Sequence, residues 1–354
     1  MTNIAHEIYI KRCFDLGRRG GKYVRSNPHV GSVIVYKNKV IGEGWHQIFG
    51  QAHAEVNALA SVKEEDKHLI KDSTIYVSLE PCNRTGKTGP CSEVILKAAI
   101  KEVVVSCLDP TIGGNSLSYL QSKGVKTTSG ICEEQGQQLL RAFNVHITAN
   151  RPYIILKYAQ SSDFYVGQID KQVWISNAFT KKLTHKWRSQ CDAILIGVNT
   201  LNTDDPLLST RQYPGESPRP IILDPTFRGL KSSFLYAKSG LKPIILTSEK
   251  IESDSLDICV FDFKNQTLLA LAQTLFNTYG ICKLMVEGGA TTLKHFIEEN
   301  LWDECRQITN SKKLQSGIKA PFIKGIKGKK YFVSDDTIQY IYNSSSNYKK
   351  QKPF

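Results

Sequence analysis

The pattern of apolar and polar positions predicts helices and short strands in alternation along the first part of the chain. Apolar residues from Ile4 to Leu16 fall near helical spacing, which predicts an amphipathic helix over 4–19. Two apolar runs flank a Lys-Asn-Lys segment within 32–44 and predict a β-hairpin. The units that follow, up to about residue 130, are predicted as helix 52–63, strand 74–80, helix 91–100 and strand 102–109. This alternation indicates a layered α/β domain.

A second series of α/β units is predicted after Asn150-Arg151-Pro152, where the proline opens a new strand. Ser176 or Asn177 is the expected N-cap of a helix over 176–190. The later elements are predicted as strands 192–198, 220–224, 242–248 and 283–289 and helix 290–300. Because 354 residues exceed the usual size of a single core, we predict two α/β domains, 1–148 and 149–354.

Composition limits the class of protein. The hydrophobic fraction is 41%, as in ordinary globular proteins, and apolar runs such as 193–198 are far shorter than the ~20 residues that span a bilayer. The N-terminal segment lacks the apolar region and cleavage site of a secretory signal. We therefore expect a soluble, cytoplasmic protein without a membrane partner.

The net charge of +13 allows two kinds of anionic partner. It permits nucleic-acid binding, but phosphorylated small molecules suit a basic surface equally well. We find no basic motif interleaved with aromatic residues and expect no nucleic-acid partner. A nucleic-acid-binding protein with a degenerate enzymatic core is the alternative from another class, and steeply salt-dependent binding would identify it.

Two of the nine cysteines, Cys82 and Cys91, stand at the ends of a Pro/Gly-containing loop within SLEPCNRTGKTGPC (78–91). The loop by itself is compatible with a disulfide, a metal site or two unrelated thiols. Scattered cysteines in an odd number are unlike the framework of a small secreted domain. In a reducing compartment a close pair is more often metal-binding than disulfide-bonded.

The segment His53-Ala54-Glu55 favours the metal interpretation. One imidazole and two thiolates offer three ligands for Zn²⁺ and leave the fourth position for water, whose pKa the metal lowers. Glu55 is placed to carry the proton from that water to a leaving amine. Zinc nucleobase deaminases share the pattern H-x-E followed by P-C-x-x-C. Here the second cysteine follows after eight residues, at the start of a predicted helix.

Four segments closely resemble the deaminase half of the bifunctional riboflavin-biosynthesis deaminase/reductase family, including its eight-residue spacer. They are NPHVG (27–31), GEGWH (42–46), HAEVNAL (53–59) and LEPCNRTGKTGPC (79–91). The resemblance implies a cytidine-deaminase-like three-layer α/β domain that deaminates 2,5-diamino-6-(5-phosphoribosylamino)pyrimidin-4-one. It implies that His53, Cys82 and Cys91 bind zinc, that Glu55 is the catalytic proton shuttle, and that Asn27, His46 and Lys87 contact the substrate.

The second half of the chain resembles the reductase half of the same family. Val286-Glu287-Gly288-Gly289 alone is a weak signal, but LKYAQSSD (156–163), WIS (174–176), GVNTLNTDDPLLSTR (197–211) and VEGGATTL (286–293) occur in the family's order. The resemblance implies a dihydrofolate-reductase-like domain that uses NADPH to reduce the ribosyl group to ribityl, giving 5-amino-6-(5-phosphoribitylamino)uracil. The implied cofactor contacts are Ala159, Trp174, Thr200, Asp204, Gly289, Ala290, Thr291, Thr292 and Leu293. The implied substrate contacts are Arg188, Leu208, Arg211 and Glu287. Family members commonly form homo-oligomers, which we also expect here.

The chain departs from the family pattern in both halves. Asn83-Arg84 replaces Ser-His after the first cysteine, and Thr111-Ile112 replaces Asn-Pro in a later loop. In the second half Phe164 replaces a glycine and Gln172 replaces a serine, and the region after 310 is rich in lysine. A deaminase of another nucleobase, with a non-catalytic second domain, is the alternative enzyme, and the short cysteine spacing of those enzymes argues against it.

Overall fold

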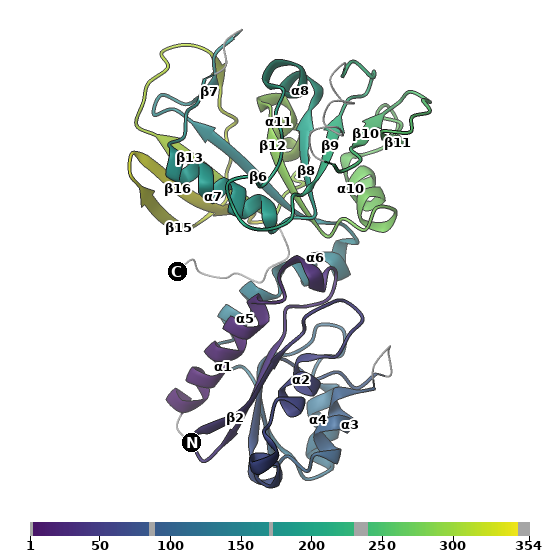
Figure 1. Cartoon of the computed structure of the whole chain (residues 1–354), viewed down its shortest axis with the longest axis vertical. Coiled ribbons are helices and arrows are strands. Elements are labelled where there is room, and N and C mark those ends of the chain that lie inside the picture. Colours follow the sequence, from purple (N-terminus) through teal and green to yellow (C-terminus); the bar gives the residue numbers. More distant parts are fainter. Residues whose placement is uncertain (1–2, 85–88, 170–172, 230–239, 346–354) are drawn as a thin grey trace. The chain divides into compact units, whose positions relative to one another are not determined.

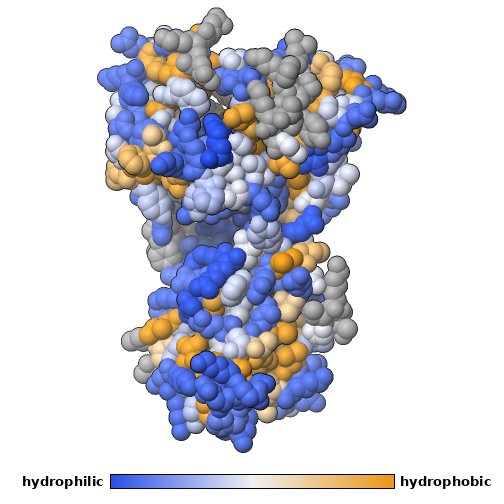
Figure 2. All heavy atoms as spheres, in the orientation of Figure 1, coloured by the Kyte–Doolittle hydropathy of each residue, from blue (hydrophilic) through white to orange (hydrophobic). Residues whose placement is uncertain are grey.

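The chain folds into two compact units, Met1–Thr148 and Ala149–Phe354 (Figure 1). The computed structural model describes residues 3–84, 89–169, 173–229 and 240–345. No helix in these described ranges is long and apolar enough to cross a membrane. Over the visible face of each unit, apolar residues lie in small groups among hydrophilic ones (Figure 2).

The first unit is built on a five-stranded sheet in the order β2-β1-β3-β4-β5. Strand β1 pairs antiparallel with β2 and β3, whereas β3, β4 and β5 run parallel. The strands are β1 (Gly31–Tyr36), β2 (Lys39–Trp45), β3 (Thr74–Leu79), β4 (Glu102–Cys107) and β5 (Lys126–Thr128). The helices are α1 (Asn3–Arg18), α2 (Ala54–Ala60), α3 (Cys91–Lys97), α4 (Asn115–Ser122), α5 (Glu133–Leu139) and α6 (Arg141–Ala149), with 3₁₀ turns at Gly21–Val24 and Glu64–Asp72.

Alternation along the strands separates the two faces of this sheet. Val33 and Val35 of β1 and Tyr76 of β3 pack with α1 and α5. Ile34 of β1 and Ile75 of β3, one position away in each strand, pack with α2, α3 and α4 on the opposite face. The result is a three-layer arrangement of helices, sheet and helices (Figure 1).

The second unit contains a nine-stranded sheet in the order β11-β10-β9-β8-β12-β6-β13-β16-β15. The strands from β11 to β13 run parallel, and β16 and β15 are antiparallel additions at one edge. The strands are β6 (Tyr153–Gln160), β8 (Ala193–Gly197), β9 (Arg219–Leu223), β10 (Ile244–Thr247), β11 (Asp257–Val260), β12 (Lys283–Gly288), β13 (Glu304–Asn310), β15 (Ile326–Val333) and β16 (Asp336–Tyr342). A separate two-stranded sheet pairs β7 (Tyr165–Gly167) with β14 (Ile318–Lys319).

Helices cover both faces of the nine-stranded sheet. Helices α10 (Leu268–Asn277) and α11 (Ala290–Glu298) pack on one face, where Phe296 and Leu271 join the main core. Helix α8 (Val198–Asp204) contributes Leu201 to a core on the other face. Helix α7 (Ala178–Ser189) lies across the front of β13 and β16 in Figure 1, with Trp187 edge-on to Tyr340. In parallel sheets of this kind, ligand sites form beyond the carboxyl ends of the strands.

Candidate active sites

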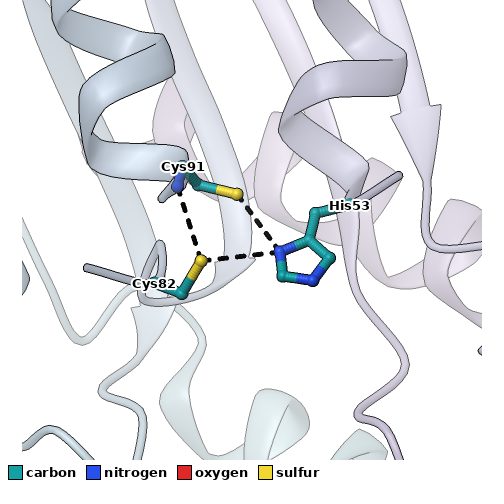
Figure 3. Close-up of side chains that lie close together, drawn as sticks. All are labelled: His53, Cys82 and Cys91. Carbon is teal, nitrogen blue, oxygen red and sulfur yellow. Dashed lines mark hydrogen bonds between the residues drawn. The ribbon is translucent and has the colours of Figure 1, made fainter. Parts of the chain in front are cut away.

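Three segments of the first unit bring His53, Cys82 and Cys91 together (Figure 3). His53 is the N-cap of α2 in extended backbone conformation, Cys82 follows β3, and Cys91 is the first residue of α3. Helix α2 can lie directly against β2 because position 44 is glycine: a Cβ there would lie 2.2 Å from the backbone nitrogen of Ala58. The fold therefore delivers one imidazole and two thiols to a single point.

The spacing of these three side chains fits a zinc ion. The Nδ1 atom of His53 lies 3.3 Å from the Cys91 sulfur and 3.5 Å from the Cys82 sulfur. Tetrahedral zinc with ordinary Zn–N and Zn–S bonds would hold a nitrogen and a sulfur ligand about 3.6 Å apart. All three ligand atoms lie within 4.8 Å of one another. The donor set and its geometry therefore match a zinc site with one position left for water.

Electrostatics at the site favour a thiolate at Cys82. A hydrogen bond from the Cys91 thiol lowers the pKa of Cys82 to about 4 against the opposing effect of burial, and the Cys91 backbone N–H also approaches the Cys82 sulfur at 3.4 Å. The same thiol–thiol hydrogen bond, followed by burial, raises the pKa of Cys91. Metal coordination would require deprotonation of both thiols.

Glu55 lies in the first turn of α2 with only 3% of its surface exposed. Burial raises the pKa of its carboxyl group, an effect that the neighbouring His53 opposes. The Cys91 thiol acts in the same direction as His53 and lowers the pKa of this carboxyl group. A buried carboxyl group with a raised pKa beside the three ligands can both accept and return a proton.

Two of the three expected substrate residues of this unit are in direct contact. The Nδ2 atom of Asn27 lies 3.1 Å from Nε2 of His46. The other ring nitrogen of His46 lies 3.1 Å from the backbone oxygen of Ala52, next to His53, and the two imidazoles meet edge to face. Lys87, the third expected substrate residue, lies outside the described residues.

Glu80 is a functional candidate within the segment LEPCNRTGKTGPC (79–91), although no sequence pattern marks it as one. This buried carboxylate, two residues before Cys82, accepts four backbone N–H groups from the β4–α4 segment. The donors are Asp109 (3.1 Å), Gly114 (2.9 Å), Ser116 (3.0 Å) and Leu117 (3.4 Å). In the same segment, the carbonyl oxygen of Thr111 accepts a hydrogen bond from the Arg84 guanidinium at 2.8 Å. The two departures from the family pattern in this unit, at 84 and 111, are thus in contact.

In the second unit Glu287, at the end of β12, lies between two cations. Its carboxylate accepts Nε of Arg188 at 2.9 Å and Nη2 at 2.8 Å, and the Lys157 ammonium is 3.7 Å away. Burial would raise the pKa of Glu287, but Arg188 and Lys157 outweigh it and hold the pKa at about 2. Lys157 lies within the segment LKYAQSSD (156–163), but a lysine in an apolar strand has no sequence pattern that marks it as a functional residue.

The expected cofactor segment lies where the first turns of α8 and α11 approach each other. Their N-caps, Gly197 and Gly289, carry no side-chain cap hydrogen bond. A Cβ at Gly197 would lie 2.5 Å from Thr292 Oγ1, and one at Gly289 would lie 3.0 Å from Thr200 Oγ1. Glycine thus permits a close approach, and the uncapped N–H groups of α11 suit the phosphates of a dinucleotide. The residues present therefore fit NADPH.

The remaining expected reductase residues differ in exposure. Leu208 and Leu293 are core residues, with 3% and 1% of their surface exposed, so their side chains pack inside the unit. Trp174 is 59% exposed, with the Lys181 ammonium 3.9 Å from its ring centroid. Three others are exposed or half-buried: Ala159 near the carboxyl end of β6, Asp204 at the end of α8, and Arg211.

Two family models match the chain in successive segments. Residues 4–107 match the cytidine and deoxycytidylate deaminase zinc-binding region, and residues 152–315 match the RibD C-terminal domain. The riboflavin biosynthesis protein RibD of Aquifex aeolicus is 35% identical over 308 residues, covering 83% of this chain and 84% of that protein. The RibD protein of Synechocystis sp. is 32% identical, covering 72% of this chain and 68% of that protein. The chain belongs to the RibD family.

Solved structures agree with this assignment across both units. A diaminohydroxyphosphoribosylaminopyrimidine deaminase/5-amino-6-(5-phosphoribosylamino)uracil reductase from Thermotoga maritima matches with a TM-score of 0.86 and 26% identity, covering 96% of this chain and 99% of that one. A RibD structure from Acinetobacter baumannii matches with a TM-score of 0.84 and 27% identity, covering 97% of this chain and all of that one. The predicted α/β class and the predicted family are therefore confirmed. This RibD-family chain combines a cytidine-deaminase-like zinc-binding domain with a reductase domain of the RibD type.

Proposed function

We propose that this RibD-family protein catalyses two successive steps of riboflavin synthesis, one in each unit. The first unit deaminates 2,5-diamino-6-(5-phosphoribosylamino)pyrimidin-4-one, and the second reduces the ribosyl group of the product to ribityl with NADPH. The observation that carries the proposal is the convergence of His53, Cys82 and Cys91 beside the buried carboxyl group of Glu55. We assign the two activities to residues 1–148 and 149–354.

In the deaminase unit, His53, Cys82 and Cys91 would hold a zinc ion, which would supply an activated water near neutral pH. Glu55 takes the proton released when the nucleophile forms and delivers it to the leaving amine, so that water and the amine become the carbonyl group and ammonia. Its raised pKa suits this exchange, because the group must be a base in one step and an acid in the next. Asn27, His46 and Lys87 are assigned to substrate binding.

In the reductase unit, NADPH supplies the hydride, and the protein positions the two partners. The starts of α8 and α11, with Thr200, Gly289 and the segment 290–292, are assigned to the cofactor. Ala159, Trp174 and Asp204 complete this assignment, with Leu293 supporting α11 from the core.

Glu287, charged and buried at the end of β12, is assigned to the sugar hydroxyls as a hydrogen-bond acceptor. Arg188 orients that carboxylate with two of its nitrogens and donates a third to the backbone oxygen of Ser209 at 3.1 Å. Arg211, which is exposed, is assigned to the substrate phosphate, whose geometry its guanidinium fits. Leu208 is assigned to shaping this side of the site, because its side chain is buried.

We also propose that the protein is a cytoplasmic homo-oligomer that binds neither nucleic acid nor membranes. A reducing compartment keeps Cys82 and Cys91 available as metal ligands. Light scattering of the purified chain tests the oligomer, and salt-dependent binding to generic RNA or DNA would contradict the nucleic-acid part.

A coupled assay tests the two activities separately. The diaminopyrimidine substrate is supplied to the zinc-loaded protein with and without NADPH, and ammonia release and NADPH oxidation are measured. We expect Glu55→Gln to slow ammonia release by roughly 10²–10⁴-fold while the protein still oxidises NADPH with the deaminated substrate. We expect the reverse for Glu287→Gln. Unchanged substrate with the zinc-loaded wild-type protein would refute the deaminase assignment.

A further inference from the structure

Strand β16 lies beyond residues 152–315, the segment that matches the RibD C-terminal domain, yet it contacts both ends of helix α7. At the N-terminal end, the buried Asp336 carboxylate accepts the backbone N–H of Asn177 at 2.9 Å and the side-chain N–H of Asn310 at 2.6 Å. The Asn177 side chain, which caps α7, donates to the backbone oxygen of Val333 at 2.7 Å. The start of α7 is therefore fixed to the edge of the sheet.

Near the C-terminal end of α7, a buried cation joins the helix to the same strands (Figure 1). Trp187 is 3% exposed, and the guanidinium carbon of Arg306, in β13, lies over its ring at 5.0 Å from the centroid. The same carbon lies 5.6 Å from the ring centroid of Tyr340, in β16. Arg306 thus contacts one ring from the helix and one ring from the sheet.

Aromatic contacts account for much of the environment of Arg306. Its Nε donates to Glu304 Oε1 at 2.6 Å, whereas its Nη1 is buried and has no hydrogen-bond partner in the part of the chain that the structure describes. A planar, weakly hydrated guanidinium packs well on aromatic faces, which attract positive charge. The position of this cation and that of the Trp187 ring therefore depend on each other.

The contact bears on the substrate site because Arg188 directly follows Trp187. Successive residues of an α-helix point about 100° apart, so these two side chains leave the same turn in different directions. Trp187 contacts the sheet, whereas Arg188 meets the Glu287 carboxylate at two points. A two-point pair depends on direction as well as distance. A rotation of α7 that moved Trp187 off its cation would therefore also move Arg188 away from Glu287.

We propose that Arg306 and Trp187 are positioning residues for reduction: their contact sets the rotation of α7 and thereby the orientation of the carboxylate that binds the ribosyl group. This inference rests on the proposed reductase function, in which Glu287 accepts hydrogen bonds from the sugar hydroxyls. Neither residue belongs to the starts of α8 and α11, which are assigned to NADPH. Loss of the contact therefore weakens binding of the ribosyl substrate and leaves binding of NADPH unchanged.

Two variants of Trp187 separate the aromatic contact from mere burial. Trp187→Leu removes the ring but stays apolar, and we expect it to raise KM for the deaminated substrate about tenfold, the scale of one desolvated cation–π contact, at unchanged KM for NADPH. Trp187→Phe keeps a ring face for the cation and should stay within about threefold of the wild-type KM. Equal KM values in Trp187→Leu and Trp187→Phe would overturn the proposal.

A matched control tests whether the effect is only a loss of stability. Phe261 is a buried aromatic residue that follows β11, at the opposite edge of the nine-stranded sheet. Phe261→Leu should lower the free energy of unfolding, as Trp187→Leu does, without raising KM for the deaminated substrate. A similar rise in KM in both leucine variants would overturn the proposal.

Arg306→Lys tests the other partner while a positive charge stays beside Glu304. A lysine lacks the planar guanidinium, so we expect KM for the deaminated substrate to lie between those of the wild type and Trp187→Leu. A double-mutant cycle with Arg188→Lys tests the route. If the contact acts through the two-point pair, Trp187→Leu causes no further rise in KM once residue 188 is lysine. Wild-type KM in Arg306→Lys, or losses that multiply in the cycle, would overturn the proposal.

A measurement without turnover separates this inference from the proposed function. Solvent exchange of the Arg188 Nε–H, followed by ¹⁵N NMR of the arginine-labelled full-length protein, reports whether the pair with Glu287 is intact. We expect slow exchange in the wild type and in Trp187→Phe, and exchange about tenfold faster in Trp187→Leu. Slow exchange in Trp187→Leu would overturn the proposal whatever the activity. The expected exchange in a protein that oxidises no NADPH would support the positioning of α7 and count against the reductase assignment.

Discussion

Arg188 and Glu287 form a two-point ion pair inside the reductase unit, with Nε–Oε1 at 2.9 Å and Nη2–Oε2 at 2.8 Å. The pair joins α7 to the end of β12, and the Glu287 side chain is only 7% exposed. Lys157 of β6 adds a second cation to the same carboxylate. Three elements that are distant in sequence thus meet at one buried negative charge.

Removing that charge is expected to damage both stability and reduction. Glu287→Gln leaves Arg188 and Lys157 buried without their counterion, which should cost about 3–5 kcal/mol in the free energy of unfolding. Denaturant unfolding measures this cost, and NADPH oxidation with deaminated substrate should fall below detection. Glu298→Gln, at an exposed i,i+4 pair with Lys294, is the matched control and should change neither quantity. A Glu287→Gln protein with wild-type stability would contradict the account of the cluster.

Acid should destabilise the protein in two separate ranges. Burial, assisted by Arg188, lowers the pKa of His185 from its ordinary 6.5 to about 4. The unfolded chain binds this proton first, so stability falls as the pH drops from about 6.5 to about 4. For Glu287, with a pKa held at about 2 against an ordinary 4.5, stability falls from about pH 4.5 toward 2. Thermal unfolding measures both, and His185→Gln should flatten only the first range. An unchanged slope in that variant would show that His185 is not responsible.

Zinc removal should abolish deamination by the first unit and leave reduction by the second unit unchanged. Dialysis against a chelator is expected to stop ammonia release, because His53, Cys82 and Cys91 lose the ion that activates water. NADPH oxidation with deaminated substrate should persist, and added Zn²⁺ should restore deamination. Glu55→Gln offers the complementary test: it should keep stoichiometric zinc yet lose roughly 10²–10⁴-fold in kcat. Metal analysis accompanies each activity measurement. Undiminished ammonia release from zinc-free protein would rule out this site.

Glu80 should stabilise the loop beside the zinc ligands. In Glu80→Gln, the amide keeps one acceptor oxygen and turns an NH₂ group toward backbone donors, so at least one buried donor is left unsatisfied. We expect a loss of about 1–3 kcal/mol per unsatisfied group, with faster hydrogen exchange over 109–117. Glu64→Gln, at an exposed ion pair, is the control and should leave both measurements unchanged. Unaltered exchange over 109–117 would mean that other contacts hold this loop.

Local chemistry made much of the fold predictable. The hairpin within 32–44 is confirmed, and its turn residues Lys37 and Asn38 both adopt positive φ, as a tight hairpin turn requires. Asn177 was one of two expected N-caps, and its side chain accepts the backbone N–H of Thr180. The zinc cluster was also predictable, because each of its three ligands lies at or near the end of a helix or strand.

Contacts between distant segments were not predictable. Nothing in the sequence around Glu80 indicates that its carboxylate will meet backbone N–H groups more than thirty residues later, from Gly114 to Leu117. The same holds for Lys157, whose partner Glu287 comes from another strand. Strand β15 was also missed, because its exposed, lysine-rich sequence lacks the apolar alternation that marks a half-buried strand.

The lysine-rich strand β15 has a consequence for how copies of this chain can meet. It is the last strand of the nine-stranded sheet, so one side of its backbone has no partner strand within that sheet. Three of its eight residues are lysines, at 327, 329 and 330. Like charges along an open edge oppose the addition of a second identical strand. Part of the chain's positive charge therefore opposes edge-to-edge aggregation. Valine or threonine at these three positions would favour pairing of β15 strands from two copies of the chain.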